Sequence, residues 1–200
     1  MRFDRPMRIA MLLSFALHLA VRAAAEPTFT KLADGCYHVF LDVGANVGLH
    51  SRFLFQPELF PRALYSKTIF DPWFGLAQER AVSTTCSFAF EPNPAHREAH
   101  AMLAANYAKK GWRYHFFPAG VGALDSKLTF YSNNAVAGGA RHHSWGFSTK
   151  CRDAKCGDNV TVPIMDLDAF INAHVIGRRL PPAPRGPPRV VVKMDIETAE

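Results

Sequence analysis

The segment of residues 40–48 most constrains how this chain can fold. It begins as an apolar stretch, typical of a strand buried on both faces, and breaks into a turn with the spacing D-x-G-x-N-x-G. Glycine lets the backbone approach a ligand where a Cβ atom would collide. Residues 87–94 repeat the pattern, because an apolar stretch again ends on a carboxylate, Glu91. The two segments predict parallel neighbouring strands whose carboxyl ends form one binding edge.

The residue types at this edge favour a nucleoside that carries no diphosphate. Glu91 is placed to accept hydrogen bonds from the ribose hydroxyls of a bound nucleoside. The turn departs from the G-x-G-x-x-G spacing of dinucleotide-binding proteins, which argues against NAD. S-adenosylmethionine is the common nucleoside ligand without phosphates, and it is the cofactor that we expect.

Strands and helices are expected to alternate along the chain. Apolar stretches predict strands at 37–43, 87–91, 112–118 and 190–195, with helices at about 47–55 and 93–110 and shorter strands at 128–131 and 160–164. Asp166 is placed to cap a further helix. This order predicts an α/β fold, a Rossmann-like, doubly wound and mostly parallel sheet with its ligand at the carboxyl edge. We expect the strand at 190–195 to be buried, residues near 52–85 to form an insertion, and the sheet to be truncated after its fourth wound strand.

Residues 1–25 have the order of a secretory signal peptide. Arginines precede an apolar run at residues 9–21, and Ala23, Ala24 and Ala25 follow it. The run is shorter than the roughly 20 residues that span a bilayer comfortably. A signal anchor and an organelle transit peptide remain as alternatives, and only an uncleaved anchor would bring membrane contact. The predicted domain is therefore 26–200, and we expect it in the secretory pathway, in the ER or Golgi lumen or secreted.

Charge and cysteine content limit the partners. Part of the formal net charge of +6 lies in the arginines of the first 25 residues, and no basic stripe interleaved with aromatics follows, so no nucleic-acid partner is expected. Cys36 and Cys86 lie before or at the start of two neighbouring strands, within reach of a disulfide. Cys151 and Cys156 bracket a short loop whose C-x4-C spacing is a poor zinc signature, and no metal site is expected. Asn159 begins a glycosylation sequon. The alternative is four reduced thiols and an unused sequon.

Four motifs, in this order, resemble those of FkbM-type methyltransferases: residues 42–48 (DVGANVG), 90–94 (FEPNP), 162–168 (VPIMDLD) and 192–197 (VKMDIE). The resemblance covers about residues 37–200. It implies a fold of the class I methyltransferase type and an S-adenosylmethionine-dependent enzyme that methylates hydroxyl oxygens. The family commonly has a glycine where Thr198 stands here.

The resemblance also implies roles for individual residues. Asp42, Gly44, Asn46 and Gly48 are expected in the turn around the methionine and ribose of the cofactor, and Glu91 is the expected ribose ligand. Ala119 and Gly120 are expected in the turn near the adenine, and Asp195 is the expected carboxylate at the end of the fourth strand. Asp195 is also the candidate catalytic residue, as the general base at the transfer site. The alternative for Asp195 is a helix cap or a hydrogen bond at the strand end.

Other side chains have simpler interpretations. His50 is expected in the first turn of a helix, His142 and His143 in an exposed polar loop, and the aromatics at 70, 73 and 74 in the packing of the insertion. Three functions remain open. They are O-methylation of a glycan, lipid or small molecule, a catalytically inactive binding module of the same fold, and a different nucleoside-using enzyme.

Overall fold

The computed structural model describes residues 30–77, 80, 84–132, 147–150, 159–182 and 186–196. The predicted signal peptide lies outside these residues, as do the loop with Cys151 and Cys156, the histidines at 142 and 143, and Thr198.

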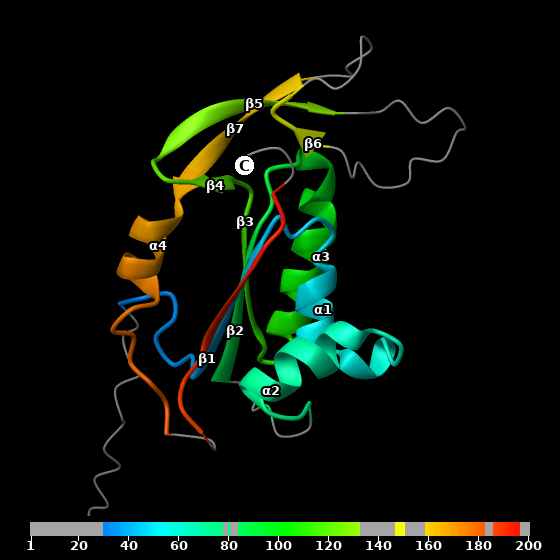
Figure 1. Cartoon of the computed structure of the whole chain (residues 1–200), viewed down its shortest axis with the longest axis vertical. Coiled ribbons are helices and arrows are strands. Elements are labelled where there is room, and N and C mark those ends of the chain that lie inside the picture. The colour runs from blue at the N-terminus through cyan, green and yellow to red at the C-terminus, as the bar shows by residue number, and fades with distance from the viewer. Residues whose placement is uncertain are drawn as a thin grey trace, which may run out of the picture.

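The main sheet has four parallel strands in the order β3-β2-β1-β8. Its strands are β1 (His38–Val43), β2 (Thr85–Phe90), β3 (Arg113–Phe117) and β8 (Val190–Met194). The helices are α1 (Leu49–Phe55), α2 (Asp71–Phe74), α3 (Arg97–Ala108) and α4 (Leu167–His174), with short helical turns at Pro57–Leu59, Ser66–Phe70 and Pro94–His96. Helices lie on both sides of the sheet (Figure 1), so the predicted α/β fold is confirmed at this level.

Two apolar clusters, one on each face of the sheet, form the core. Alternate residues of β1 and β2 enter different clusters because successive side chains of a strand point to opposite faces. Val39, Leu41 and Phe88 pack with Phe170 of α4 on one face. On the other face, Phe40 packs among residues of α1, α3 and the segment between α1 and β2.

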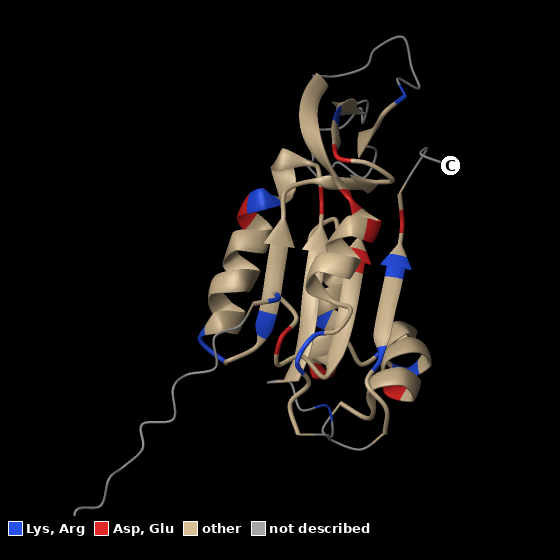
Figure 2. Ribbon diagram, turned by 90° about the vertical axis from the view of Figure 1, so that its left-hand side faces the viewer, with Lys and Arg blue, Asp and Glu red and all other residues tan. Residues whose placement is uncertain are grey.

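A second, mixed sheet lies across the carboxyl end of the main sheet. It contains β4 (Gly120–Gly122), β7 (Asn159–Asp166), β5 (Ser126–Ser132) and β6 (Phe147–Ser148), in that order. Its β4 and β7 are parallel, whereas β5 is antiparallel to β7 and β6. Figure 2 shows the arrowheads of the parallel strands pointing toward this sheet. The sequence predicted short strands here but not a separate layer.

The expectation that residues 190–195 form a buried strand is wrong. In β8, Val190, Val192 and Met194 are 40%, 43% and 53% exposed. Within the described part of the chain β8 pairs only with β1, so it is an edge strand there. Its register places these three side chains on the face that α4 covers over β1 and β2, but no residue of β8 joins that cluster.

The segment between α1 and β2 packs as expected at two of its three aromatic positions. Phe70 and Phe74 are buried in the cluster with Phe40. Trp73 is half exposed instead, with the guanidinium of Arg189 over its ring at 5.3 Å from the centroid. Trp73 precedes the buried Phe74 in α2, and successive residues of a helix point in directions about 100° apart, so the two rings do not share a face.

The predicted disulfide between Cys36 and Cys86 is confirmed, with a Cα–Cα distance of 5.6 Å. Such a bond is compatible with an oxidising compartment. Asn159 of the sequon is exposed at the start of β7. Among the helices of the described residues, none has the length and apolar character needed to cross a membrane.

Candidate functional site

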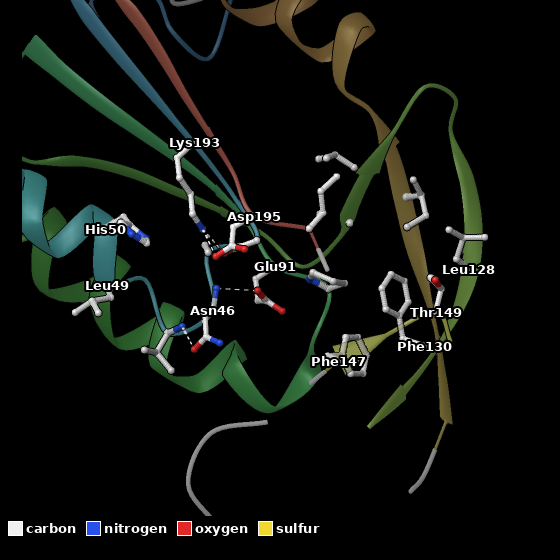
Figure 3. Close-up of a pocket in the computed structure, with 18 residues that line it drawn as sticks. Asn46, Leu49, His50, Glu91, Leu128, Phe130, Phe147, Thr149, Lys193 and Asp195 are labelled. Atoms are coloured by element: carbon white, nitrogen blue, oxygen red, sulfur yellow. Dashed lines mark hydrogen bonds and ion pairs between the residues drawn. The ribbon is translucent and has the colours of Figure 1, made fainter. Parts of the chain in front are cut away.

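A cavity of about 210 Å³ lies between the carboxyl edge of the main sheet and the second sheet. The turn after β1, the start of the turn after β2, and the end of β8 supply its polar side (Figure 3). This edge lies at the point where the strand order reverses, since the chain runs from β1 to β3 on one side and returns to β8 on the other. Ligands of open α/β sheets bind at such a point.

The structure brings five of the eight predicted site residues together in this cavity: Gly44, Asn46, Glu91, Gly120 and Asp195. The other three lie close by but do not line it. Asp42 is buried within β1, Ala119 is buried beside β4, and Gly48 packs against α3 and β3.

Glu91 is held by the backbone at the end of β2. Its Oε2 accepts a hydrogen bond from the amide of Asn46 at 2.8 Å, and its Oε1 accepts one from the amide of Asn93, also at 2.8 Å. Burial raises the pKa of Glu91, and these two amides, which bond to the charged form, oppose the rise. Each carboxylate oxygen has two lone pairs, so both oxygens retain capacity for a further donor.

Gly44 is required by packing rather than by approach of a ligand. Its φ is +70°, and a Cβ atom there would lie 2.0 Å from the carbonyl oxygen of Asp195. The amide of Asp195 donates to the carbonyl of Val43 at 3.1 Å, which draws the ends of β1 and β8 together. The close approach at this glycine is therefore that of the neighbouring strand, and its role toward a cofactor stays a prediction.

Lys193 is the main site residue that the sequence interpretation did not single out. Its ammonium donates to the carbonyl of Gly44 at 2.7 Å and lies 3.4 Å from Oδ1 of Asp42 and 3.6 Å from Oδ2 of Asp195. The Lys193 ammonium is thus within ion-pair distance of two carboxylates at the ends of neighbouring strands. The available signal was a lysine inside the otherwise apolar sequence of β8.

Asp42 is a buried carboxylate between two basic side chains. Among the described residues, its Oδ1 accepts no hydrogen bond and faces Lys193 and, at 3.9 Å, Nδ1 of His50. Burial raises the pKa of Asp42, and the charge of Lys193 opposes that shift. Asp42 therefore acts on the site through its neighbours and not by touching the cavity.

His50 lies in the first turn of α1, as expected, but its ring also lines the cavity. It contacts the ring of Tyr65, with centroids 4.5 Å apart. Burial lowers the pKa of His50, while the carboxylate of Asp42 opposes the change. The lowered pKa favours the neutral imidazole near neutral pH, and among the described residues no hydrogen bond is made by its Nε2.

The second sheet gives the cavity an apolar wall. Phe130 of β5 and Phe147 of β6 stack with centroids 4.9 Å apart and planes 7° apart, and Leu128, Val121 and Ile164 extend the same wall. Figure 3 shows Phe130 and Leu128 on the side of the cavity away from His50. The sequence did not predict this wall, because it depends on where the second sheet sits.

Across the described residues, no group of three or more His, Cys, Asp or Glu side chains is arranged to hold a metal ion. No family model, no curated protein and no solved structure matches this chain. The likeness to FkbM-type methyltransferases therefore rests on the four sequence motifs alone.

Proposed function

We propose that this cavity binds S-adenosylmethionine and that the protein is a methyltransferase with a fold of the class I type. The proposed reaction is O-methylation of a hydroxyl on a glycan, a lipid or a small molecule. The observation that carries the proposal is the convergence of polar groups from three adjacent parallel strands on one cavity whose opposite wall is apolar. A nucleoside with a charged tail needs both kinds of surface.

The residues present suit the parts of this cofactor. Glu91 retains acceptor capacity for the ribose hydroxyls. Gly120 borders the apolar wall near Ile164 and Phe130, which suits the flat adenine ring, while Ala119 is buried beside it and does not line the cavity. The remaining part of the cavity, between the turn at Gly44 and Asn46 and the side chain of Asp195, is assigned to the methionine portion.

When bound, S-adenosylmethionine supplies a methyl carbon that is already activated by a sulfonium. The protein then has to align the acceptor oxygen with that carbon and take the proton that the hydroxyl loses. Asp195 is the first candidate to take this proton, because its carboxylate is 67% exposed at the cavity and is oriented by Lys193. His50 is a second candidate, since its free Nε2 belongs to a neutral ring.

Donor binding tests the first part of the proposal. Calorimetry with S-adenosylmethionine and with S-adenosylhomocysteine on the full chain is expected to show saturable binding. Glu91→Gln removes one carboxylate oxygen and the charge, and we expect it to weaken binding roughly tenfold or more, as for hydrogen bonds to a charged group. Glu98→Gln, on the exposed side of α3, is the matched control and is expected to bind like the wild type. A well-folded wild type that binds neither compound would refute the proposal.

Methyl transfer separates an enzyme from an inactive binding module. Protein incubated with methyl-labelled S-adenosylmethionine and a mixture of glycans, lipids or secreted small molecules is expected to label one of these classes. Asp195→Asn, with donor binding retained and labelling lost, would support the proposed base. Because the disulfide is compatible with an oxidising compartment, we propose that the acceptor is met in the secretory pathway.

A further inference from the structure

Asn46 adopts a backbone conformation that residues other than glycine seldom take. Its φ is +52°, and it is the one non-glycine residue with positive φ in the part of the chain that the structure describes. Asparagine tolerates this region better than other L-residues because its side chain can bond locally, and here its Oδ1 accepts from the amide of Val47 at 2.9 Å. Both polar groups of its backbone are fixed by other elements. The amide donates to Glu91 at 2.8 Å, and the carbonyl lies 2.6 Å from Nε2 of His100 on α3.

The partners of His100 determine where its proton sits. A carbonyl oxygen can only accept a hydrogen bond, so Nε2 must carry the hydrogen that is donated to Asn46. Nδ1 is then an acceptor, and the hydroxyl of Tyr114 on β3 donates to it. The His100 ring is fully buried and stacks on Phe116, with centroids 4.1 Å apart. Burial lowers the pKa of His100 to about 4, so the ring is neutral near neutral pH.

The far end of the same turn rests on the same pair of side chains. A Cβ atom at Gly48 would lie 3.3 Å from the hydroxyl of Tyr114 and 3.4 Å from Cε1 of His100. It would also lie 2.6 Å from Leu103 of α3. The turn that borders the cavity is therefore held against α3 by a hydrogen bond at Asn46, and against α3 and β3 by close packing at Gly48.

We propose that His100 and Tyr114 are positioning residues of the site. Tyr114 fixes the tautomer of His100, His100 holds the carbonyl of Asn46, and Asn46 in that conformation directs its amide at Glu91. Neither side chain lines the cavity. The identity of the ligand bound in the cavity rests on the proposed function. The coupling of His100 to Glu91 through Asn46 does not depend on it.

Two amide substitutions separate the roles of the two ring nitrogens. In His100→Gln the side-chain amide nitrogen can take the place of Nε2 and still donate to Asn46. In His100→Asn the amide group reaches only to the place of Nδ1, so the bond to Asn46 is lost. His115→Asn is the control, because His115 is a largely buried ring of the same strand as Tyr114 that stacks on Phe88.

The first measurement is binding of S-adenosylhomocysteine by calorimetry. We expect His100→Asn to weaken binding roughly tenfold. His100→Gln should restore binding to within a fewfold of the wild type, and His115→Asn should leave it unchanged. Tyr114→Phe keeps the ring but frees the tautomer of His100, so an intermediate loss is expected. Equal weakening in the Gln and Asn variants would overturn the assignment, since a merely structural role does not distinguish them.

The second measurement does not need a ligand. Nitrogen-15 spectra of the imidazole are expected to show hydrogen on Nε2 of His100 in the wild type and a mixture of tautomers in Tyr114→Phe. Hydrogen exchange of the Asn46 amide should accelerate in His100→Asn but not in His100→Gln. If the wild type binds no S-adenosylhomocysteine while these signatures hold, the proposed function fails and the positioning role stands. Unchanged exchange at Asn46 in both variants would refute the positioning role itself.

Discussion

Mild acid is expected to destabilise this protein through its buried histidines. Burial lowers the pKa of His38 and of His100 from 6.5 to about 4, and for His38 the charges of Arg178 and Arg189 add to the effect. Between these two pKa values the unfolded chain binds a proton that the folded chain does not. Each histidine therefore makes its full contribution to the free energy of unfolding above about pH 6.5, and this contribution is lost as the pH falls toward 4.

The size of the effect follows from the shift. For a group whose pKa is about 6.5 unfolded and about 4 folded, lowering the pH from about 7 to about 5 removes about 1.8 kcal/mol of unfolding free energy. His38 and His100 together remove about 3.6 kcal/mol, a large part of the stability of an ordinary domain. Burial also lowers the pKa of His50 and His115, which adds to the loss.

Two carboxyl groups act in the opposite direction. Burial raises the pKa of Asp42 and of Glu91, so the folded chain takes up their protons before the unfolded chain does. This adds stability as the pH falls and offsets part of the histidine effect. The depressed pKa of Asp34 contributes only at still lower pH, because its stabilisation is lost below the ordinary pKa of an aspartate.

A difference between two pH values isolates one histidine from these opposing groups. Urea unfolding of the wild type and of His38→Gln, with the disulfide intact, gives the cost of the substitution at about pH 7 and again at about pH 5. That cost should shrink by about 1.8 kcal/mol at the lower pH, because glutamine does not titrate. The same experiment on His100→Gln should give the same difference. A cost that is equal at both pH values would show that the folded pKa is not depressed, and it would refute the reasoning.

Three further experiments test the packing at Gly44, the contribution of the disulfide and the role of the Asp195 carboxylate. Gly44→Ala should cost more than about 3 kcal/mol of unfolding free energy or prevent folding. Gly111 has the same φ of +70° but nothing within 4 Å of an added Cβ atom, so Gly111→Ala should cost only about 1–2 kcal/mol. Similar costs for the two variants would show that close packing is not the cause. Replacing the Cys36–Cys86 disulfide, whose cysteines are 50 residues apart, with alanines should cost about 4 kcal/mol, measured by urea unfolding, and a loss below about 1 kcal/mol would contradict this. Asp195→Ala should change stability by less than about 0.5 kcal/mol, whereas Asp166→Ala should cost about 1 kcal/mol.

The main sheet was predictable because its signals are local. The strand predicted at 37–43 is found at His38–Val43, and that predicted at 190–195 at Val190–Met194. Each is an apolar stretch that ends at a charged residue or a glycine. The disulfide followed from register alone, since parallel neighbours bring Cys36 and Cys86 to the same end of the sheet.

The rest of the site depends on contacts between distant parts of the chain. Lys193 meets Asp42 across about 150 residues of sequence, and no local pattern indicates that a lysine in an apolar strand faces a buried carboxylate. The apolar wall of Phe130 and Phe147 was missed for the same reason. The burial of β8 was predicted wrongly because composition shows that a strand is apolar but not which helix covers it.

The comparison of Asp195 with Asp166 bears on the two interpretations of the carboxylate at the end of β8. A structural carboxylate in this fold uses its oxygens, as Asp166 does when its Oδ1 accepts from the amide of Ala169 at 2.9 Å and caps α4. At Asp195 the structural work is done by the main chain, through the bond to Val43 and the close approach of Gly44. Its carboxylate caps nothing among the described residues and is 67% exposed, with the ammonium of Lys193 at 3.6 Å. Because this carboxylate is largely exposed to solvent, its ion pair with the mostly buried Lys193 is screened and contributes little to stability. A carboxylate that the fold does not need, held at the cavity by a cation, is the arrangement expected of a group that acts on a ligand.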